Sequence, residues 1–312
     1  MLRNAFLWSL VAAFGFTPIA AAPAAQTSAN AVYNKPQPPG ELIDIGGRRL
    51  HIHCKGNAKG PVVIFEAGLS QFTADSTYGA AQSRIATFAR VCIYDRAGLG
   101  WSDPVPNARF HLEMVKDLHK LLNAKSLSGP FVLVGHSIGG LLSRLYAKQY
   151  PTEVAAVVLV DATPETYLFG SGMAQARRQL IEQIANGLKN AEPGVPVVPM
   201  AENTPAEVMM AFTPEILNTV KQEYEAIDLA PQEFKRVNGY GTLGNTPLVV
   251  IRRGQTATPP NTDDREWRTA QETLTQLSTR STLIVAEKSG HVIPYDEPDV
   301  VAKAVQSVLL AL

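Results

Sequence analysis

A series of uninterrupted apolar runs, separated by helical patterns, is the feature that most restricts the fold of this sequence. The runs read PVVIFEAG, RVCIYDRAG, FVLVG, VAAVVLVD, PLVVIRRG and STLIVAE (61–68, 90–98, 131–135, 154–161, 247–254 and 281–287). Strands without polar alternation are buried on both faces, and the helical segments between most of them would cover the sheet. Before them, Glu41–Gly56 alternates apolar and polar residues around Gly46 and Gly47, which predicts a β-hairpin. The sequence therefore predicts an α/β protein.

One long interval between strands has a different character. Helical patterns cover Met173–Lys189 and Pro214–Ile227, and the proline-rich stretch AEPGVPVVPMAENTP separates them. We expect a helical cap over residues 163–245, inserted after the sixth strand of a core formed by residues 41–162 and 246–312. With 46% hydrophobic and 18% charged residues, the chain has enough apolar material for one large core.

The amino-terminal residues have the pattern of a targeting segment. Arg3 precedes the apolar run Ala5–Phe16, and a tail of small residues follows at Thr17–Ala25. The run is shorter than the roughly 20 residues that a membrane span needs. This predicts a signal peptide over residues 1–24, a periplasmic or secreted protein without a stable membrane span, and a flexible arm over residues 25–40. An uncleaved anchor or a buried helix is the alternative.

The charge distribution narrows the class of partner. Basic and acidic residues number 28 each, and no cluster of lysine and arginine is long enough to follow a phosphate backbone. We therefore expect a small-molecule substrate and no nucleic acid. Oligomeric state is left open.

The stretch LVGHSIGG places a serine between glycines where an apolar strand meets a helical pattern. The spacing Gly135-x-Ser137-x-Gly139 is typical of a nucleophile elbow, in which the serine oxygen stands above the strand ends. We expect glycine at both positions because a Cβ there would collide with neighbouring backbone. At the start of the helix, the Ile138 N–H would be one oxyanion donor. The alternative is a serine that only caps the helix.

Two further blocks bring a family resemblance into view. YDRAGLGWSD (Tyr94–Asp103) and SGHVIPYDEPDVV (Ser289–Val301), together with the elbow, resemble the α/β-hydrolase family, and specifically its secreted or periplasmic serine hydrolases. The resemblance covers nearly everything after Gly40. It implies a mostly parallel eight-stranded sheet, helices on both faces, a pocket under the cap, and chemistry that needs neither a metal nor an organic cofactor.

The resemblance also selects one of the six histidines as general base. His291 follows Ser289 and Gly290 in a loop after the last strand, at the position from which the family's imidazole reaches the serine oxygen. A general base typically contributes 10²–10⁴-fold to the rate. The other histidines are expected to pack or to face solvent, and a solvated loop residue is the alternative for His291 itself.

A second oxyanion donor should come from the loop after the third predicted strand, FEAGLSQF. Relatives often have His-Gly where this chain has Ala67-Gly68. Because backbone N–H groups form such a hole, the change of side chain need not remove it. We expect the Leu69 N–H to be the donor and Gly68 to let the loop approach Ser137. Loss of one such donor typically costs about 10²–10³ in rate.

The acid that orients His291 is not in its usual place. In most relatives it follows the seventh strand, but counting from Gly254 puts Ala257 there. Some members of the fold carry the acid after the sixth strand instead, where this sequence has Asp161. The order Ser137, Asp161, His291 keeps the family order of serine, acid and histidine.

Three other carboxylates remain as alternatives to Asp161. Asp263 and Asp264 lie in NTDDREW, which looks like a helix start where acidic residues favour the helix dipole. Glu165 follows Asp161 closely along the chain.

The two cysteines lie in separate predicted strands. The family's sheet places the strand of Cys54 beside that of Cys92, and export would favour oxidation, so we hypothesise a Cys54–Cys92 disulfide. Two buried thiols are the alternative, because a bridge has strict geometry.

These residues together predict a serine hydrolase that cleaves a carboxylic ester or a related acyl compound through an acyl-enzyme. Aminopeptidase, lactonase, thioesterase and cofactor-free perhydrolase activities on the same fold remain alternatives. A non-catalytic binding protein with a hydrolase fold is the alternative of another class. Acyl chain length is left open.

Overall fold

The fold is centred on one eight-stranded sheet in the order β1-β2-β4-β3-β5-β6-β7-β8. This computed structural model describes residues 34–73, 77–165, 174–198, 200, 204–255 and 262–312, so the predicted signal peptide and most of the predicted arm lie outside the described residues. The strands are β1 (Glu41–Asp44), β2 (Arg49–Lys55), β3 (Val63–Glu66), β4 (Val91–Tyr94), β5 (Phe131–His136), β6 (Val154–Val160), β7 (Leu248–Arg253) and β8 (Ser281–Ala286). β2 runs antiparallel to β1 and β4, and all other neighbours are parallel. The predicted α/β-hydrolase fold is confirmed.

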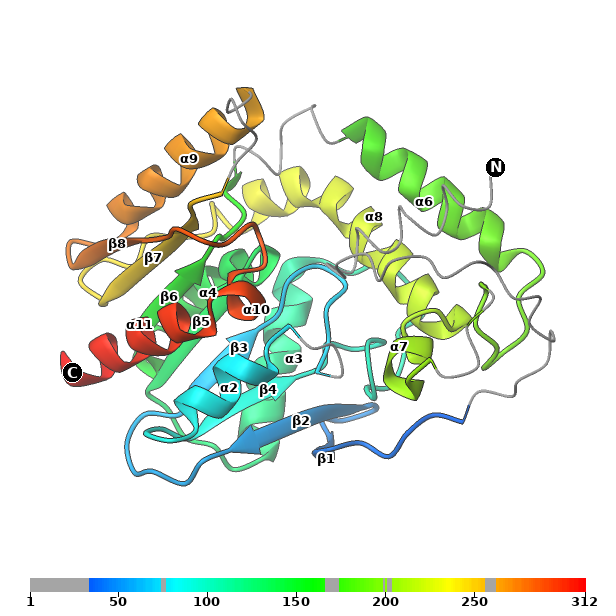
Figure 1. Ribbon diagram of the computed structural model, residues 1–312, viewed down its shortest axis with the longest axis horizontal. Helices are drawn as coiled ribbons and strands as arrows, with labels where there is room; N and C mark the ends of the chain where they lie inside the picture. Colours follow the sequence, from blue (N-terminus) through cyan, green and yellow to red (C-terminus); the bar gives the residue numbers. More distant parts are fainter. Residues whose placement is uncertain (1–33, 74–76, 166–173, 199, 201–203, 256–261) are drawn as a thin grey trace.

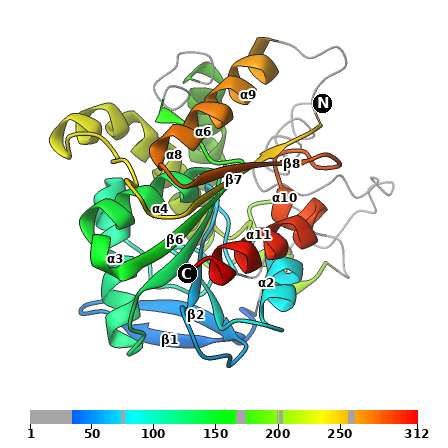
Figure 2. The same cartoon turned by 90° about the vertical axis from the view of Figure 1, so that its left-hand side faces the viewer.

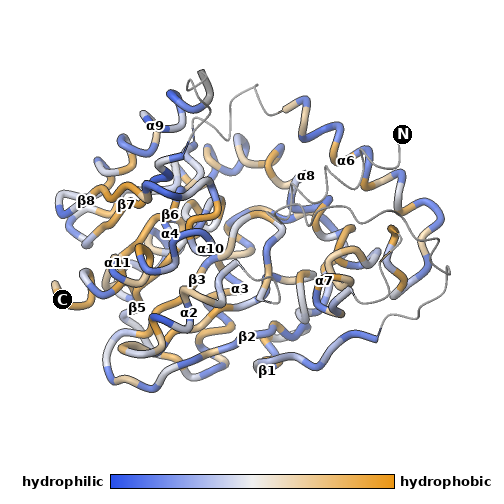
Figure 3. Tube along the Cα trace, viewed as in Figure 1, coloured by the Kyte–Doolittle hydropathy of each residue, from blue (hydrophilic) through white to orange (hydrophobic). Residues whose placement is uncertain are grey.

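Hydrophobic side chains line both faces of the central strands. Every residue of β3, β4 and β5 is buried, and all but one residue of β6 are buried as well. Figure 3 shows the same strands in the colours of hydrophobic residues, in contrast to the largely hydrophilic helix α9 (Thr262–Leu274). The apolar runs that form β3, β4, β5 and β6 are therefore strands that helices cover on both sides. The run at 281–287 is an exception, because it forms the edge strand β8, where only Ala286 is buried.

Two helical layers cover the sheet, one on each face. The helices of the first layer are α2 (Gly79–Ile85), α10 (Ile293–Asp296) and α11 (Pro298–Leu310). Those of the second are α3 (His111–Ala124), α4 (Ile138–Gln149) and α9. Short 3₁₀ turns, η1 (Pro151–Glu153) and η2 (Thr275–Leu277), precede β6 and β8. Figure 2 shows α2 and α11 on one side of the sheet, with α3 and α4 on the other.

Among the described residues, three helices lie between β6 and β7 in the chain and gather to one side of the sheet (Figure 1). They are α6 (Ala174–Leu188), α7 (Ala206–Met210) and α8 (Pro214–Arg236). Ile184 of α6, Met210 of α7 and Leu217 of α8 belong to one hydrophobic cluster, which also contains Leu99 and Trp101 of the core. The inserted helices thus pack on the loop that follows β4.

Helix α8 extends further than its sequence pattern predicts, because it runs through Pro231 to Arg236 rather than ending near Ile227. A proline inside a helix removes one backbone donor, so continuation needs compensating tertiary contacts. These come from Ala230 and Glu233, which are fully buried; the Glu233 carboxylate accepts hydrogen bonds from the first N–H groups of α3. Packing between the two helices therefore outweighs the local preference of the sequence.

The last residues of the predicted arm, described from Asn34, lie against the core. Trp101 Nε1 donates to the carbonyl oxygen of Pro36 at 2.7 Å, and the Gly40 N–H donates to His51 Nε2 at 3.1 Å.

No helix among the described residues combines the length and apolar character that crossing a membrane requires.

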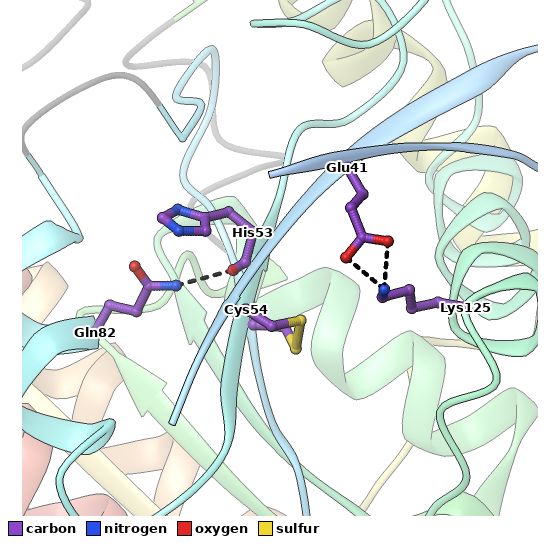
Figure 4. The surroundings of a disulfide bond; sticks show 6 residues. Glu41, His53, Cys54, Gln82 and Lys125 are labelled. Atoms are coloured by element: carbon purple, nitrogen blue, oxygen red, sulfur yellow. Dashed lines mark hydrogen bonds and ion pairs between the residues drawn. A yellow bond between two sulfur atoms is a disulfide. The ribbon is translucent and has the colours of Figure 1, made fainter. Parts of the chain in front are cut away.

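A disulfide joins β2 to β4. The antiparallel register places Cys54 directly opposite Cys92, and the structure bonds the two sulfur atoms. Around this bond, Lys125 of α3 pairs with Glu41 of β1, and the Gln82 side chain donates to the carbonyl oxygen of His53 (Figure 4). The bridge closes a loop between residues 38 positions apart, so it restricts the unfolded chain.

Replacing both cysteines, Cys54→Ala and Cys92→Ala, should lower the free energy of unfolding by about 3–4 kcal/mol, from the loop-closure entropy. Urea unfolding followed by circular dichroism measures this difference. A reducing agent should destabilise the wild type by a similar amount and leave the double variant unaffected. Equal stability of the oxidised and reduced wild type would contradict the prediction.

Candidate active site

Ser137 occupies a strained turn between β5 and α4. Its backbone φ of 55° and ψ of −126° lie in a region that residues with side chains rarely adopt. An added Cβ at Gly135 would come within 2.4 Å of the carbonyl oxygen of Gly139, and one at Gly139 within 2.1 Å of that of Glu66. Both glycines are therefore required for the turn to form this close to the end of β3. The turn places Ser137 directly after the carboxyl end of β5.

The structure brings Ser137, His291 and Asp161 into one hydrogen-bonded line. Ser137 Oγ lies 3.0 Å from His291 Nε2, and His291 Nδ1 lies 2.7 Å from Asp161 Oδ2. An ionised carboxylate can only accept, so in neutral His291 the hydrogen is on Nδ1 and Nε2 is an acceptor for the serine hydroxyl. The three residues come from the ends of β5, β6 and β8, which the parallel sheet places at one edge.

Asp161 is fully buried, and four hydrogen bonds from described residues reach its carboxylate. Besides His291, the donors are the backbone N–H of Arg253 (3.1 Å), the guanidinium of Arg253 (3.1 Å) and the indole N–H of Trp267 (3.0 Å). Burial alone would raise the pKa of Asp161, but His291, Arg253 and Trp267 outweigh it and hold the pKa below its ordinary value. The carboxylate therefore stays ionised beside the imidazole.

Arg253 and Trp267 are parts of this arrangement that the sequence did not point to. The guanidinium of Arg253 lies over the Trp267 ring, and that ring also packs edge-on against the imidazole of His291. Arg253 ends the strand after which most relatives carry the acid. The absence of the usual acid after this strand was the one feature of the sequence that could have drawn attention to Arg253. No motif in the sequence around Trp267 indicated a role at the site.

The other candidate acids have different positions. Asp264 lies 3.6 Å from the guanidinium of Arg253, and Glu165 forms a bidentate ion pair with Arg144. Ala257 and the side chain of Asp263 lie outside what the structure describes. Among the carboxylates whose side chains are described, Asp161 is the one that hydrogen-bonds to His291.

His136, directly before the serine, is buried and supports the histidine loop. Its Nε2–H donates to the backbone oxygen of His291 at 2.8 Å, while Nδ1 faces Tyr78 and Gln71. Burial, and secondarily the charge of His291, lowers the pKa of His136 from 6.5 to about 3. His136 is therefore neutral at physiological pH.

This shift predicts a pH-dependent stability. Between pH 6.5 and about 3 the unfolded chain protonates His136 and the folded protein does not, so the folded state loses stability as the pH falls. The variant His136→Gln has no imidazole at this position, so it does not lose this part of its stability as the pH falls. Its destabilisation relative to wild type should therefore shrink below pH 6.5, by up to about 1.4 kcal/mol per pH unit. Urea unfolding from pH 8 to pH 5 measures the difference, and a constant difference would contradict the prediction.

The loop after β3 lies against the elbow. A Cβ at Gly68 would approach Gln71 Oε1 to 2.3 Å and His136 Nδ1 to 3.0 Å, so only glycine fits there without displacing these side chains. Leu69 follows in this loop, and Ile138 begins α4. Within the described part of the chain, neither the Leu69 nor the Ile138 N–H donates to a protein group.

Most of the other histidines belong to separate polar networks. His51 is fully buried and bonds to Asp95, which also accepts from the backbone of Trp101 and so pins the loop after β4. His111 pairs with Glu233, and His119 pairs with Glu153 at the surface.

Known proteins resemble this chain in sequence and in fold. The family model described as alpha/beta hydrolase fold matches residues 61–189. The uncharacterized protein YqjL of Bacillus subtilis (strain 168) is 26% identical over 268 residues, which cover 86% of this chain and 90% of that protein.

Solved structures share the fold at low sequence identity. A thermophilic esterase from Thermogutta terrifontis is 20% identical, with a TM-score of 0.58 over 85% of this chain and 94% of the esterase. The enol-lactonase from Burkholderia xenovorans LB400 is 16% identical, with a TM-score of 0.58 over 86% of this chain and 100% of the lactonase. With the sheet order and the strand-to-helix turn described above, these matches show that the chain has the α/β-hydrolase fold.

Proposed function

We propose that this protein is a serine hydrolase that cleaves a carboxylic ester, or a closely related acyl compound, through an acyl-enzyme on Ser137. The observation that carries the proposal is the continuous line from Ser137 Oγ to His291 Nε2 (3.0 Å) and from His291 Nδ1 to Asp161 (2.7 Å). An isolated serine hydroxyl is a weak nucleophile, and this arrangement supplies the base and the orienting acid that it needs.

In the proposed mechanism, His291 Nε2 takes the proton of Ser137 as the oxygen attacks the substrate carbonyl. Asp161 accepts the Nδ1–H of His291, fixes its tautomer and stabilises the imidazolium that forms. The N–H groups of Leu69 and Ile138 stabilise the oxyanion of the tetrahedral intermediate. His291 then protonates the leaving group, and a water molecule activated by the same imidazole releases the acyl group.

Two similar proteins support acyl chemistry. One is named an esterase and the other an enol-lactonase, and both names describe cleavage of an ester bond. At identities of 20% and 16% these proteins share only the fold with this chain. The substrate of this chain therefore has to be identified from the residues around its own Ser137. The cap proposed for residues 163–245 is where we expect acyl-chain selectivity to be set.

A panel of nitrophenyl esters of graded acyl length, with matched nitroanilides, tests the proposed reaction. Wild-type protein should hydrolyse at least one ester, and Ser137→Ala should leave only background hydrolysis. Turnover confined to the anilides would move the function to a peptidase. Equal ester turnover by both proteins would refute the serine mechanism.

Export is a second part of the proposal. The Cys54–Cys92 disulfide suits an oxidising compartment, and the first 24 residues have the pattern of a signal peptide. We expect periplasmic or secreted protein to begin close to Ala25 when its amino terminus is sequenced. A start at Met1 in a cytosolic fraction would contradict this.

A further inference from the structure

A buried cluster of charged side chains joins helix α8, in the inserted segment, to the loop that carries Leu69. At its centre is Arg96, which follows β4 and is 4% exposed. Its guanidinium donates to the Glu223 carboxylate of α8 at 2.7 and 3.1 Å and to Glu66 of β3 at 3.3 Å. Arg96 makes two hydrogen bonds to Glu223 and one longer bond to Glu66, whose pKa burial raises to about 7, so Glu223 is the principal counter-charge of Arg96.

The same two side chains also hold the backbone on either side of Leu69. Arg96 donates to the carbonyl oxygens of Ala67 at 2.8 Å and Gly68 at 2.7 Å. Glu223 accepts from the N–H of Ser70 at 2.6 Å. Ser70 has a φ of 63°, an unfavourable conformation that this bond helps to keep.

The hydrogen bond to the Gly68 oxygen has a geometric consequence for Leu69. The Gly68 C=O and the Leu69 N–H belong to one planar trans peptide unit and point in opposite directions. When Arg96 fixes the carbonyl, it also fixes the direction of the Leu69 N–H. The bond from Ser70 to Glu223 anchors the next peptide unit, so the Leu69 amide cannot rotate without breaking a buried charged contact.

We propose that Arg96 and Glu223 are positioning residues that aim the Leu69 N–H at the developing oxyanion. This inference rests on the proposed hydrolase function. It assigns the inserted segment a part in stabilising the transition state as well as in holding substrate. A displacement of α8 that breaks the Glu223 contacts would loosen the oxyanion loop and slow the reaction.

The test compares Glu223→Gln with Glu225→Gln. Glu225 lies on the same helix, where it forms a surface ion pair with Lys221, so its amide variant controls for the loss of one charge from α8. For each protein, kcat and KM are measured with the best ester of the panel. Inhibition constants are measured for the trifluoromethyl ketone analogue of that ester, which forms a tetrahedral adduct with the serine, and for the matching methyl ketone.

In Glu223→Gln we expect kcat to fall by about 10–100-fold with little change in KM, because the interaction lost is made only in the transition state. Affinity for the trifluoromethyl ketone should fall by a similar factor, while affinity for the methyl ketone stays unchanged. Glu225→Gln should match the wild type in all four quantities. Glu223→Asp keeps a negative charge beside Arg96 but shortens the reach to Ser70, and it should show the same pattern if Glu223→Gln does not fold.

Two results would overturn the inference. A folded Glu223 variant with wild-type kcat and trifluoromethyl ketone affinity would show that the loop holds its position without α8. Equal loss of affinity for both ketones would show that Glu223 only shapes the pocket. Either result is distinct from failure of the proposed function, which would appear as equal turnover by wild type and Ser137→Ala.

Discussion

Ser137→Ala should lower kcat for the best nitrophenyl ester by about 10⁴–10⁶-fold, because it removes the hydroxyl on which we propose that the acyl-enzyme forms. The protein should remain folded, since alanine keeps the Cβ of Ser137 and removes only the oxygen that bonds to His291 (3.0 Å) and Thr163 (3.4 Å). Steady-state hydrolysis and circular dichroism measure the two quantities. KM for residual turnover should change little.

Ser143→Ala is the matched control for this experiment. Ser143 lies in α4, well beyond the elbow, and its buried hydroxyl has no hydrogen-bond partner in the described structure. That variant should keep the wild-type rate. If Ser137→Ala hydrolysed the ester as fast as Ser143→Ala, Ser137 would not be the nucleophile.

Asp161→Asn should lower turnover by up to about 10⁴-fold while the protein stays folded, because an amide in place of the carboxylate favours the wrong tautomer of His291. The size and shape of the side chain are preserved, so its acceptor oxygen can still receive hydrogen bonds from Trp267 and Arg253. The rate and the thermal unfolding midpoint are the measurements.

Asp264→Asn and Asp263→Asn serve as the matched comparisons for Asp161. The Asp264 carboxylate pairs with Arg253, so its loss should affect the rate far less than that of Asp161. Should Asp161→Asn keep a near wild-type rate while either comparison variant loses most of its activity, the acid lies after β7 and our assignment is wrong.

The fold could be predicted largely because its determinants are local. Each buried parallel strand appears in the sequence as an apolar run without alternation, as in the stretch that becomes β6 (Val154–Val160). The full extent of α8 could not be predicted in this way. Pro231 favours an end to the helix, and only the packing of Ala230 and Glu233 against distant residues overrides that preference.

Some residues of the candidate site could likewise be predicted from the sequence, and others could not. Ser137 and its glycines form one contiguous motif, and His291 and Asp161 lie at strand ends that the resemblance could identify. Arg253 and Trp267 could not be found so, because their bonds to Asp161 span 92 and 106 residues of chain. The contact from Glu223 to Ser70 spans 153 residues of chain and depends on how helix α8 packs against the core. Such contacts leave no periodic trace in a single sequence.

The most direct test of the central claim is to trap the acyl-enzyme and locate it. Wild-type protein is mixed with an excess of a nitrophenyl ester, quenched in acid within the first turnovers, digested and analysed by mass spectrometry. We expect an acyl adduct on the peptide that contains Ser137, and no such adduct in Ser137→Ala treated in the same way. Rapid ester turnover with the adduct on a different residue, or with the same adduct retained in Ser137→Ala, would contradict this claim.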